Sequence, residues 1–489
     1  MISKAFIKSS FIYSVIGALP LASATILLPF YTNLLTTSQF GVLALYIAFT
    51  AIIQIIVNYS LDNYAIIHYI ENKANKDLIK DTIGTVVISL LVIGILMIAI
   101  SLIFGNGLFK LYSSLTHNKT IIEFFPYGIM SVVTAVFNSF FKTYTHLLIA
   151  QQQPNKFFWM NVFNFVLTIS ISLAGLYMFP KTLTGPLWGR LLSGLGIFIM
   201  ALFFFIREFG IGFQCRLIKD MLKYSSPLLI YLILFWIISN IDRYIIGYFL
   251  PSEKIGIFDF AIKCTILLEF FQNGLTSAIN PKIYNIWCDN KTPSNTPEIN
   301  RYYNGFTVVT LICLPVFILV LPYIIPLIVK NKDYFISFNF LAILAMGYAI
   351  TGLRTMYQLP VLYFKKTGIL PRVYSYSAVI QVTATIIAVK YMGLMGAVWV
   401  NFLIKLLQVF FLHIETRKTF VLEYNRVKLL YLPLFFCFIT CAFYFAIKLL
   451  SLNYLVWGIH LFIVYIAVYF VFRKEVRMLI KDFSFKTMF

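Results

Sequence analysis

The sequence is poor in charged residues. Only 12% of its 489 residues are Asp, Glu, Lys or Arg, which is about half of the roughly 25% found in soluble globular proteins. Apolar residues make up 60% of the chain. A chain of this composition cannot cover a water-exposed surface, which excludes a cytosolic enzyme, a disordered protein and a secreted disulfide scaffold.

The sequence also lacks the signatures of common enzymes and cofactor sites. It contains no P-loop, so ATP does not drive the protein directly, and no HExxH, GxSxG or dinucleotide-binding fingerprint. Its six cysteines are scattered, without the spacing of a zinc site. We therefore expect no enzyme activity, no metal and no cofactor. A membrane-bound polymerase or acyltransferase would need a large outer loop, and the longest outer segment that we predict lies near residues 105–120.

Long apolar runs occupy most of the chain. Residues 9–61 contain no charged residue, a length that suits two membrane helices, because one span needs about 20 apolar residues. The whole chain predicts an all-α integral membrane protein with about 14 transmembrane helices. The predicted spans are 9–31, 40–61, 83–104, 122–147, 157–179, 185–206, 225–249, 255–279, 305–329, 335–360, 370–390, 394–413, 429–449 and 455–472.

The charge that is present is mostly positive. The chain has 39 Lys and Arg against 18 Asp and Glu, a formal net charge of +21. With a cytoplasmic N-terminus, the inner segments hold 25 Lys and Arg and the outer segments 8, as the positive-inside rule requires. We predict a multi-pass protein with cytoplasmic N- and C-termini. Most of the excess charge then reflects topology and contact with anionic lipids, and we expect no nucleic-acid partner.

Two pairs of similar segments indicate an internal repeat. Residues 34–46 resemble 249–261, and residues 185–198 resemble 396–410. In the first pair we expect Gly41 and Gly256 to supply a permissive backbone at a tight turn. Six helices separate the copies, so both have the same orientation, as in transporters built from parallel repeats.

The repeat predicts two pseudo-symmetric six-helix lobes around a central cavity, plus two C-terminal helices. The predicted domains are an N-lobe at 1–208 (helices 1–6), a C-lobe at 209–414 (helices 7–12), and residues 415–489, which hold helices 13 and 14 and a basic cytoplasmic tail.

Polar residues recur every four positions in several predicted spans. This spacing places them on one helix face, as in the stripe Thr50, Gln54, Asn58 and Asp62 of the second predicted span. The fourth predicted span has the same step in Thr134, Asn138, Lys142 and His146. Polar groups at membrane depth need a partner or a water-filled cavity. For a single Asn or Thr, hydrogen bonding between helices, worth about 0.6 kcal/mol, is the favoured alternative; for the set we favour a cavity. The predicted polar lining comprises Gln54, Asn58, Asn138, Asn161, Asn164, Gln358 and Gln381.

Cations inside or near the spans point to an anionic substrate. Arg190 and Arg354 have no acid within one helical turn, so they need a partner elsewhere. The planar guanidinium group suits phosphate. Lys142 could instead extend toward the cytoplasmic face. The predicted substrate-binding cations are Arg190, Arg243, Lys263, Arg354 and Lys142.

Acidic residues in the spans are candidates for coupling transport to a proton or sodium gradient. Glu269 lacks a local cation, and we expect its carboxylate to be deep and desolvated. Asp259 and Lys263, four residues apart, could neutralise each other. The predicted ion-coupling candidates are Glu269, Asp242, Asp62 and Glu123.

Three segments resemble a known family. Residues 27–46 resemble the opening of the Wzx-type O-antigen flippases, which are polysaccharide transporters of the multidrug/oligosaccharidyl-lipid/polysaccharide exporter superfamily. Residues 224–263 are similar to their seventh and eighth helices, with Pro227, Asp242, Arg243 and Gly256 in matching places, and residues 393–406 are similar to their twelfth.

The resemblance implies a flippase of the bacterial inner membrane. Its substrate would be an undecaprenyl-pyrophosphate-linked oligosaccharide of O-antigen, capsule or exopolysaccharide, moved to the outer leaflet by ion-coupled alternating access, with antiporter-like exchange. A polysaccharide polymerase and a chain-length regulator are the partners it suggests. The alternative is a cation-coupled exporter of drugs or small amphipathic compounds. The first predicted span has no acid and the first three have no arginine, unlike multidrug exporters and lipid II flippases respectively.

Overall fold

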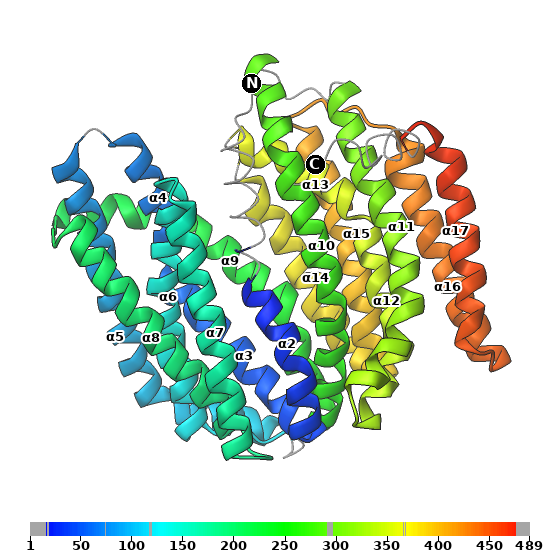
Figure 1. Cartoon of the computed structure of the whole chain (residues 1–489), viewed down its shortest axis with the longest axis horizontal. Helices are drawn as coiled ribbons and strands as arrows, with labels where there is room; N and C mark the ends of the chain where they lie inside the picture. Colours follow the sequence, from blue (N-terminus) through cyan, green and yellow to red (C-terminus); the bar gives the residue numbers. More distant parts are fainter. Residues whose placement is uncertain are drawn as a thin grey trace. The chain divides into compact units, whose positions relative to one another are not determined.

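The computed structural model describes residues 16, 19–73, 75–116, 120–290, 297–364, 366 and 368–475. Within these ranges the regular elements are helices, and no strand occurs (Figure 1). The predicted all-α class is therefore confirmed. The chain separates into two compact units, Met1–Asp259 and Phe260–Phe489, and the boundary falls inside one long helix, α10 (Ser252–Asn290). The predicted lobes at 1–208, 209–414 and 415–489 remain a prediction.

Unit 1 is a helical bundle in which α7 packs on α8, α3 and α8 pack on α6, and α2 packs on α7. Local signals mark the helix starts: α3 opens with a capping box between Thr36 and Gln39, and α7 opens with Pro154 in its first turn. The elements of unit 1 before α10 are α2 (Leu19–Leu34), α3 (Thr37–Asn58), α4 (Leu61–Glu71), α5 (Lys76–Leu115), η1 (Phe124–Gly128), α6 (Ile129–Ala150), α7 (Pro154–Met178), α8 (Thr184–Phe209) and α9 (Cys215–Phe249).

Unit 2 is also a helical bundle, in which α14 packs on α15, α11 on α17, and α12 on α15 and α16. Its elements after α10 are α11 (Pro297–Ile328), η2 (Lys332–Ser337), α12 (Phe338–Ala349), α13 (Thr351–Tyr363), α14 (Ile369–Met392), α15 (Leu394–Arg417), η3 (Val427–Tyr431), α16 (Leu432–Leu450), η4 (Tyr454–Val456) and α17 (Trp457–Val471).

Among the described residues, 11 helices are long and apolar enough to cross a membrane, or 12 when residues 332–363, a helix pair bent by 42°, count as one span. The protein is thus a multi-pass membrane protein, but the predicted count of 14 is not confirmed. The two predicted spans without a counterpart in this set are the first and the eighth. Much of residues 9–18 lies outside the described residues, and α10 carries charged residues along much of its length.

Apolar side chains cover the outside of the long helix α5. Ile95, Ile103 and Leu108 are exposed by 64%, 71% and 63% of their surface. An exposed apolar face of this extent is unfavourable in water and favourable against lipid tails. The surface of α5 therefore agrees with the membrane assignment.

Gly41 and Gly256 do not supply the tight turn that their sequence context predicts. Both lie inside helices, and neither has a positive φ. Instead they let α3 approach the first turn of α10: a Cβ atom at Gly41 would overlap the carbonyl oxygen of Ser252, and one at Gly256 would overlap that of Thr37. Such small residues permit close helix contact in membrane bundles.

Candidate functional site

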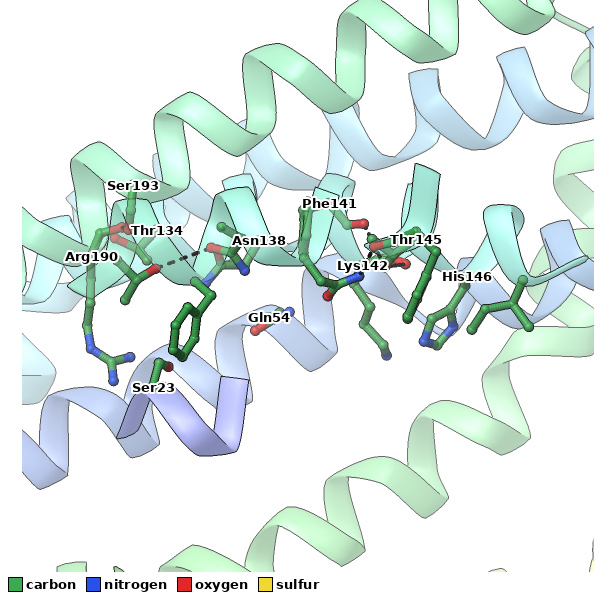
Figure 2. Close-up of a pocket in the computed structure, with 16 residues that line it drawn as sticks. Ser23, Gln54, Thr134, Asn138, Phe141, Lys142, Thr145, His146, Arg190 and Ser193 are labelled. Carbon is green, nitrogen blue, oxygen red and sulfur yellow. Dashed lines mark hydrogen bonds between the residues drawn. The ribbon is translucent and has the colours of Figure 1, made fainter. Parts of the chain in front are cut away.

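Unit 1 contains a polar cavity of about 430 Å³ between α2, α3, α6, α7 and α8 (Figure 2). Four of its lining residues are aromatic or aliphatic, and the others are polar or basic; among the described residues, no carboxylate lines it. The lining residues are Ser23, Gln54, Thr134, Asn138, Phe141, Lys142, Thr145, His146, Ile149, Phe157, Asn161, Asn164, Phe165, Thr168, Arg190 and Ser193.

Helix α6 supplies one wall of the cavity. Thr134, Asn138, Lys142 and His146, each four residues after the last, all line it. The helical repeat places these side chains along one face, as the sequence spacing predicts. The opposite side of α6 buries apolar residues such as Phe140 inside unit 1. The amphipathic helix therefore presents its polar stripe to the cavity.

Helix α7 contributes three amide or hydroxyl residues. Asn161 donates a hydrogen bond from Nδ2 to the carbonyl oxygen of Phe157 at 2.8 Å, which leaves its Oδ1 as an acceptor. Thr168 donates from Oγ1 to Oδ1 of Asn164 at 3.2 Å. All three line the cavity. The wall therefore offers neutral donors and acceptors, the groups that bind sugar hydroxyls.

The stripe predicted on the second span is interrupted. α3 ends at Asn58, and the next two residues, Tyr59 and Ser60, have left-handed φ angles of 47° and 59° before α4 begins at Leu61. Asp62 therefore does not continue the face of α3. Only Gln54 of the stripe lines the cavity, and Asn58 is buried, with its Nδ2 donating to Oγ1 of Thr143 at 3.1 Å.

Asp62 lies buried behind the basic end of the α6 stripe. Its Oδ2 is 3.1 Å from Nζ of Lys142 and 2.9 Å from Nδ1 of His146. The Asp62 side chain is 0% exposed, whereas those of Lys142 and His146 are about one-third exposed, at 33% and 34%. A buried carboxylate in a membrane helix requires such partners. Lys142 is thus held in place by an ion pair.

Arg190 brings a positive charge into the cavity. It lies on α8, and its guanidinium group extends into the cavity near Ser23 (Figure 2). No ion pair of Arg190 occurs within the described ranges, and its buried Nε has no hydrogen-bond partner there. An unsatisfied buried donor is costly. This group is therefore available to an anionic ligand.

Three other predicted residues of unit 1 lie elsewhere. Arg243 is buried, and its Nε donates to Oδ1 of Asp259 at 2.7 Å, so α9 and the start of α10 are joined by an ion pair. Asp242, next to it, is buried as well. Glu123 is exposed, and its backbone exchanges two hydrogen bonds with the hydroxyl of Tyr46, at 2.7 and 2.8 Å. None of the three lines the cavity.

The remaining predicted residues belong to unit 2. Lys263 lies on α10, Arg354 and Gln358 on α13, and Gln381 is buried on α14. Glu269 on α10 is exposed, so other protein groups do not cover its side chain. Its membrane depth and its role as a coupling group stay predictions.

Sequence reasoning missed several lining residues as site candidates. His146 belongs to the predicted four-residue stripe without being a named candidate, and the structure adds its contact with Asp62. Ser23 and Ser193 had no distinct signal, since isolated serines are common in membrane helices. They line the cavity only because α2 and α8 pack beside α7 and α6.

The membrane-spanning helices and the cavity together define a multi-pass membrane protein with a polar site inside one helical unit, and family comparison makes this class more specific. Residues 6–287 match the family model described as "Polysaccharide biosynthesis protein", more than half of the chain. The protein belongs to that family. No curated protein sequence matches the chain.

Solved structures show the same fold at low sequence identity. The structure "Lipid II flippase MurJ, inward closed conformation" has a TM-score of 0.72 and 14% identity, covering 95% of this chain and 99% of that one. An inward-facing multidrug resistance MATE family transporter of the MOP superfamily has a TM-score of 0.58 and 13% identity, covering 85% and 95%. An outward-facing MATE transporter has a TM-score of 0.55 and 13% identity, covering 85% and 96%.

Proposed function

We propose that the protein is a flippase for undecaprenyl-pyrophosphate-linked oligosaccharide repeat units of O-antigen, capsule or exopolysaccharide. It would move them from the cytoplasmic to the outer leaflet of the bacterial inner membrane by alternating access. Membership of the polysaccharide biosynthesis family supports a substrate that contains a glycan, and the fold shared with a lipid flippase supports a substrate that is linked to a lipid.

The observation that carries this proposal is that, within the described part of the chain, Arg190 has no acidic partner and no carboxylate lines its cavity. A guanidinium group forms paired, charge-assisted hydrogen bonds with phosphate oxygens. The amides and hydroxyls of α6 and α7 can bind sugar hydroxyls beside it. A volume of about 430 Å³ is within the range of small-ligand sites, so the cavity suits a pyrophosphate and adjoining sugar.

We propose a proton or sodium gradient as the energy source. Among the predicted coupling acids, Asp62 contacts two cavity residues, Lys142 and His146. A proton or sodium ion bound to Asp62 would neutralise its carboxylate and free the Lys142 ammonium group for the substrate. Release of that ion would restore the ion pair between Asp62 and Lys142. This exchange would link ion binding to substrate affinity.

The alternative, a cation-coupled exporter of small amphipathic compounds, needs an unpaired acid facing the cavity. In the described part of unit 1, Asp62 is paired with Lys142 and His146, and Glu123 does not line the cavity. A cavity with surplus positive charge repels cationic compounds. The charge distribution therefore favours the flippase.

A reconstituted transport assay tests the proposal. Proteoliposomes holding the full chain and an undecaprenyl-pyrophosphate-linked oligosaccharide are treated with a glycosidase that reaches only the outer leaflet. We expect the wild type to accelerate exposure of the glycan, and Arg190→Gln to lower the rate at least about tenfold, because one charge-assisted contact of this kind is worth roughly 1.5–3 kcal/mol.

Arg207→Gln is the matched control. Arg207 lies on the same helix, α8, is exposed, and contacts the ring of Phe203 at 6.0 Å, outside the cavity. The Arg207→Gln substitution removes the same charge, and we expect it to leave the flipping rate at the wild-type value. No acceleration by the wild type, or equal rates for Arg190→Gln and the wild type, would reject the proposal.

A further inference from the structure

Unit 2 contains a second polar pocket, of about 600 Å³, at one end of its bundle. It lies where α13 and α15 end and η3 begins, and the connection 418–426 forms part of its wall. The predicted topology assigns this end to the cytoplasmic membrane surface. The lining residues are Tyr357, His413, Thr416, Arg417, Phe420, Val421, Leu422, Tyr424, Arg426, Leu430 and Tyr431.

The pocket is positively charged, and no acid of the described residues lines it. Arg417 and Arg426 are exposed, and neither forms an ion pair with another described residue. The acid on the same turn of α15, Glu415, is 2.6 Å from Nζ of Lys418, and does not line the pocket. Two guanidinium groups therefore remain available to one ligand.

Aromatic and imidazole side chains that contact one another form the floor of the pocket. Tyr357 is 2% exposed, and its hydroxyl lies 2.7 Å from Nδ1 of His413. The ring of Tyr424 packs edge-on against Tyr357 with centroids 6.0 Å apart. Hydroxyl and ring N–H groups add donors beside the arginines. The set is suited to the oxygens of a phosphate group.

The rim of the pocket is apolar. Val421 and Tyr431 are exposed by 75% and 54% of their surface, and Leu430 also lines the pocket. A free phosphate ion gains nothing from such a rim, whereas a lipid can lay its chains along it. Basic pockets between membrane helices on the cytoplasmic side bind anionic lipid headgroups. Tyr is enriched at the membrane–water interface.

We propose that this pocket binds the phosphate group of an anionic membrane phospholipid, with Arg417 and Arg426 holding the phosphate and the acyl chains passing Val421 and Tyr431. The site lies in unit 2 and shares no residue with the cavity of unit 1. It does not depend on the proposed transport function. Free phosphate and a polyprenyl pyrophosphate share the same headgroup chemistry, so the experiment must separate them.

Native mass spectrometry of the purified full chain provides the test. The delipidated protein is titrated with phosphatidylglycerol, phosphatidylcholine or undecaprenyl pyrophosphate, and then with excess inorganic phosphate. We expect a preference for phosphatidylglycerol over phosphatidylcholine that excess phosphate does not remove. Arg417→Gln with Arg426→Gln should weaken phosphatidylglycerol binding at least about tenfold.

Arg473→Gln is the matched control for surface charge. Arg473 follows α17, is exposed, and does not line the pocket, so we expect wild-type binding. The proposal fails if the double variant binds phosphatidylglycerol as the wild type does, or if Arg473→Gln loses as much. It also fails if phosphatidylcholine binds equally, if inorganic phosphate displaces the lipid, or if undecaprenyl pyrophosphate alone binds through these arginines. Because both arginines are exposed, either single variant serves as the readout if the double variant does not fold.

Discussion

Lys142 on α6 places its Nζ 3.1 Å from the buried carboxylate of Asp62 on α4. The contact joins two helices, and it fixes one of the cations that line the cavity of unit 1. It also leaves Arg190 as the cavity arginine without an acidic partner among the described residues. The positive charge that the cavity offers to a ligand therefore depends on the pairing of Lys142 with Asp62.

Removing the buried acid should destabilise unit 1. In Asp62→Asn, Lys142 and His146 lose their anionic partner, and we expect the free energy of unfolding to fall by about 1–3 kcal/mol. This is less than the 3–5 kcal/mol usual for a broken buried pair, because both bases are about one-third exposed. Thermal unfolding of the detergent-solubilised protein measures the change, and an unaltered melting temperature would contradict it.

A double variant identifies the ion pair as the cause. Asp62→Asn combined with Lys142→Met removes both charges, so we expect a smaller loss than the sum of the two single losses. Simple additivity would mean that the two side chains do not interact.

Close contact between α3 and α10 should be sensitive to one added methyl group. Gly41→Ala puts a Cβ against the carbonyl oxygen of Ser252, so the helices must separate, at a cost of about 1–3 kcal/mol. Gly107→Ala on α5 is the control, because a Cβ there meets no atom within 4 Å. We expect a lower melting temperature for Gly41→Ala only; equal melting temperatures would show that the contact is loose.

The sequence predicts the polar faces of α6 and α7 well, because uninterrupted helices keep residues four apart on one side. The same spacing misleads at Asp62, since Tyr59 and Ser60 adopt left-handed backbone angles that neither residue type favours. No pattern in the local sequence predicts this break between α3 and α4. The stripe on the second span is therefore correct only as far as α3 extends.

Charge pairing is harder to predict than periodicity. The partner of Arg243 is Asp259, which is 16 residues away on the next helix, so inspection within one turn does not reveal it. Arg190 and Arg243 are both basic residues inside apolar spans, and the acid next to Arg243 in the sequence, Asp242, is not the acid that pairs with its Nε. Only the packing of α9 against α10 shows that one is paired with an acid and that the other faces a cavity.

The paired arginine should matter more for folding than for transport. Arg243→Met breaks the buried contact with Asp259, which costs about 3–5 kcal/mol, so we expect little folded protein in membranes. Adding Asp259→Asn should restore part of the folded protein, because it removes the unpaired buried carboxylate. Fluorescence-detected size exclusion of membrane extracts measures folded protein. A normal amount of Arg243→Met with lost flipping would instead place this arginine in the substrate path.

The unpaired arginine should show the opposite behaviour. Arg190→Lys keeps the charge but loses the planar pair of donors, so we expect flipping rates between those of the wild type and Arg190→Gln. Both variants should reach wild-type protein amounts, because no ion pair of Arg190 with another described residue is broken. Initial flipping rates per folded molecule in proteoliposomes provide the comparison. If Arg190→Lys is as slow as Arg190→Gln, bidentate contact is essential and charge alone is insufficient. If both variants are unstable, Arg190 stabilises the bundle and its assignment to the substrate is wrong.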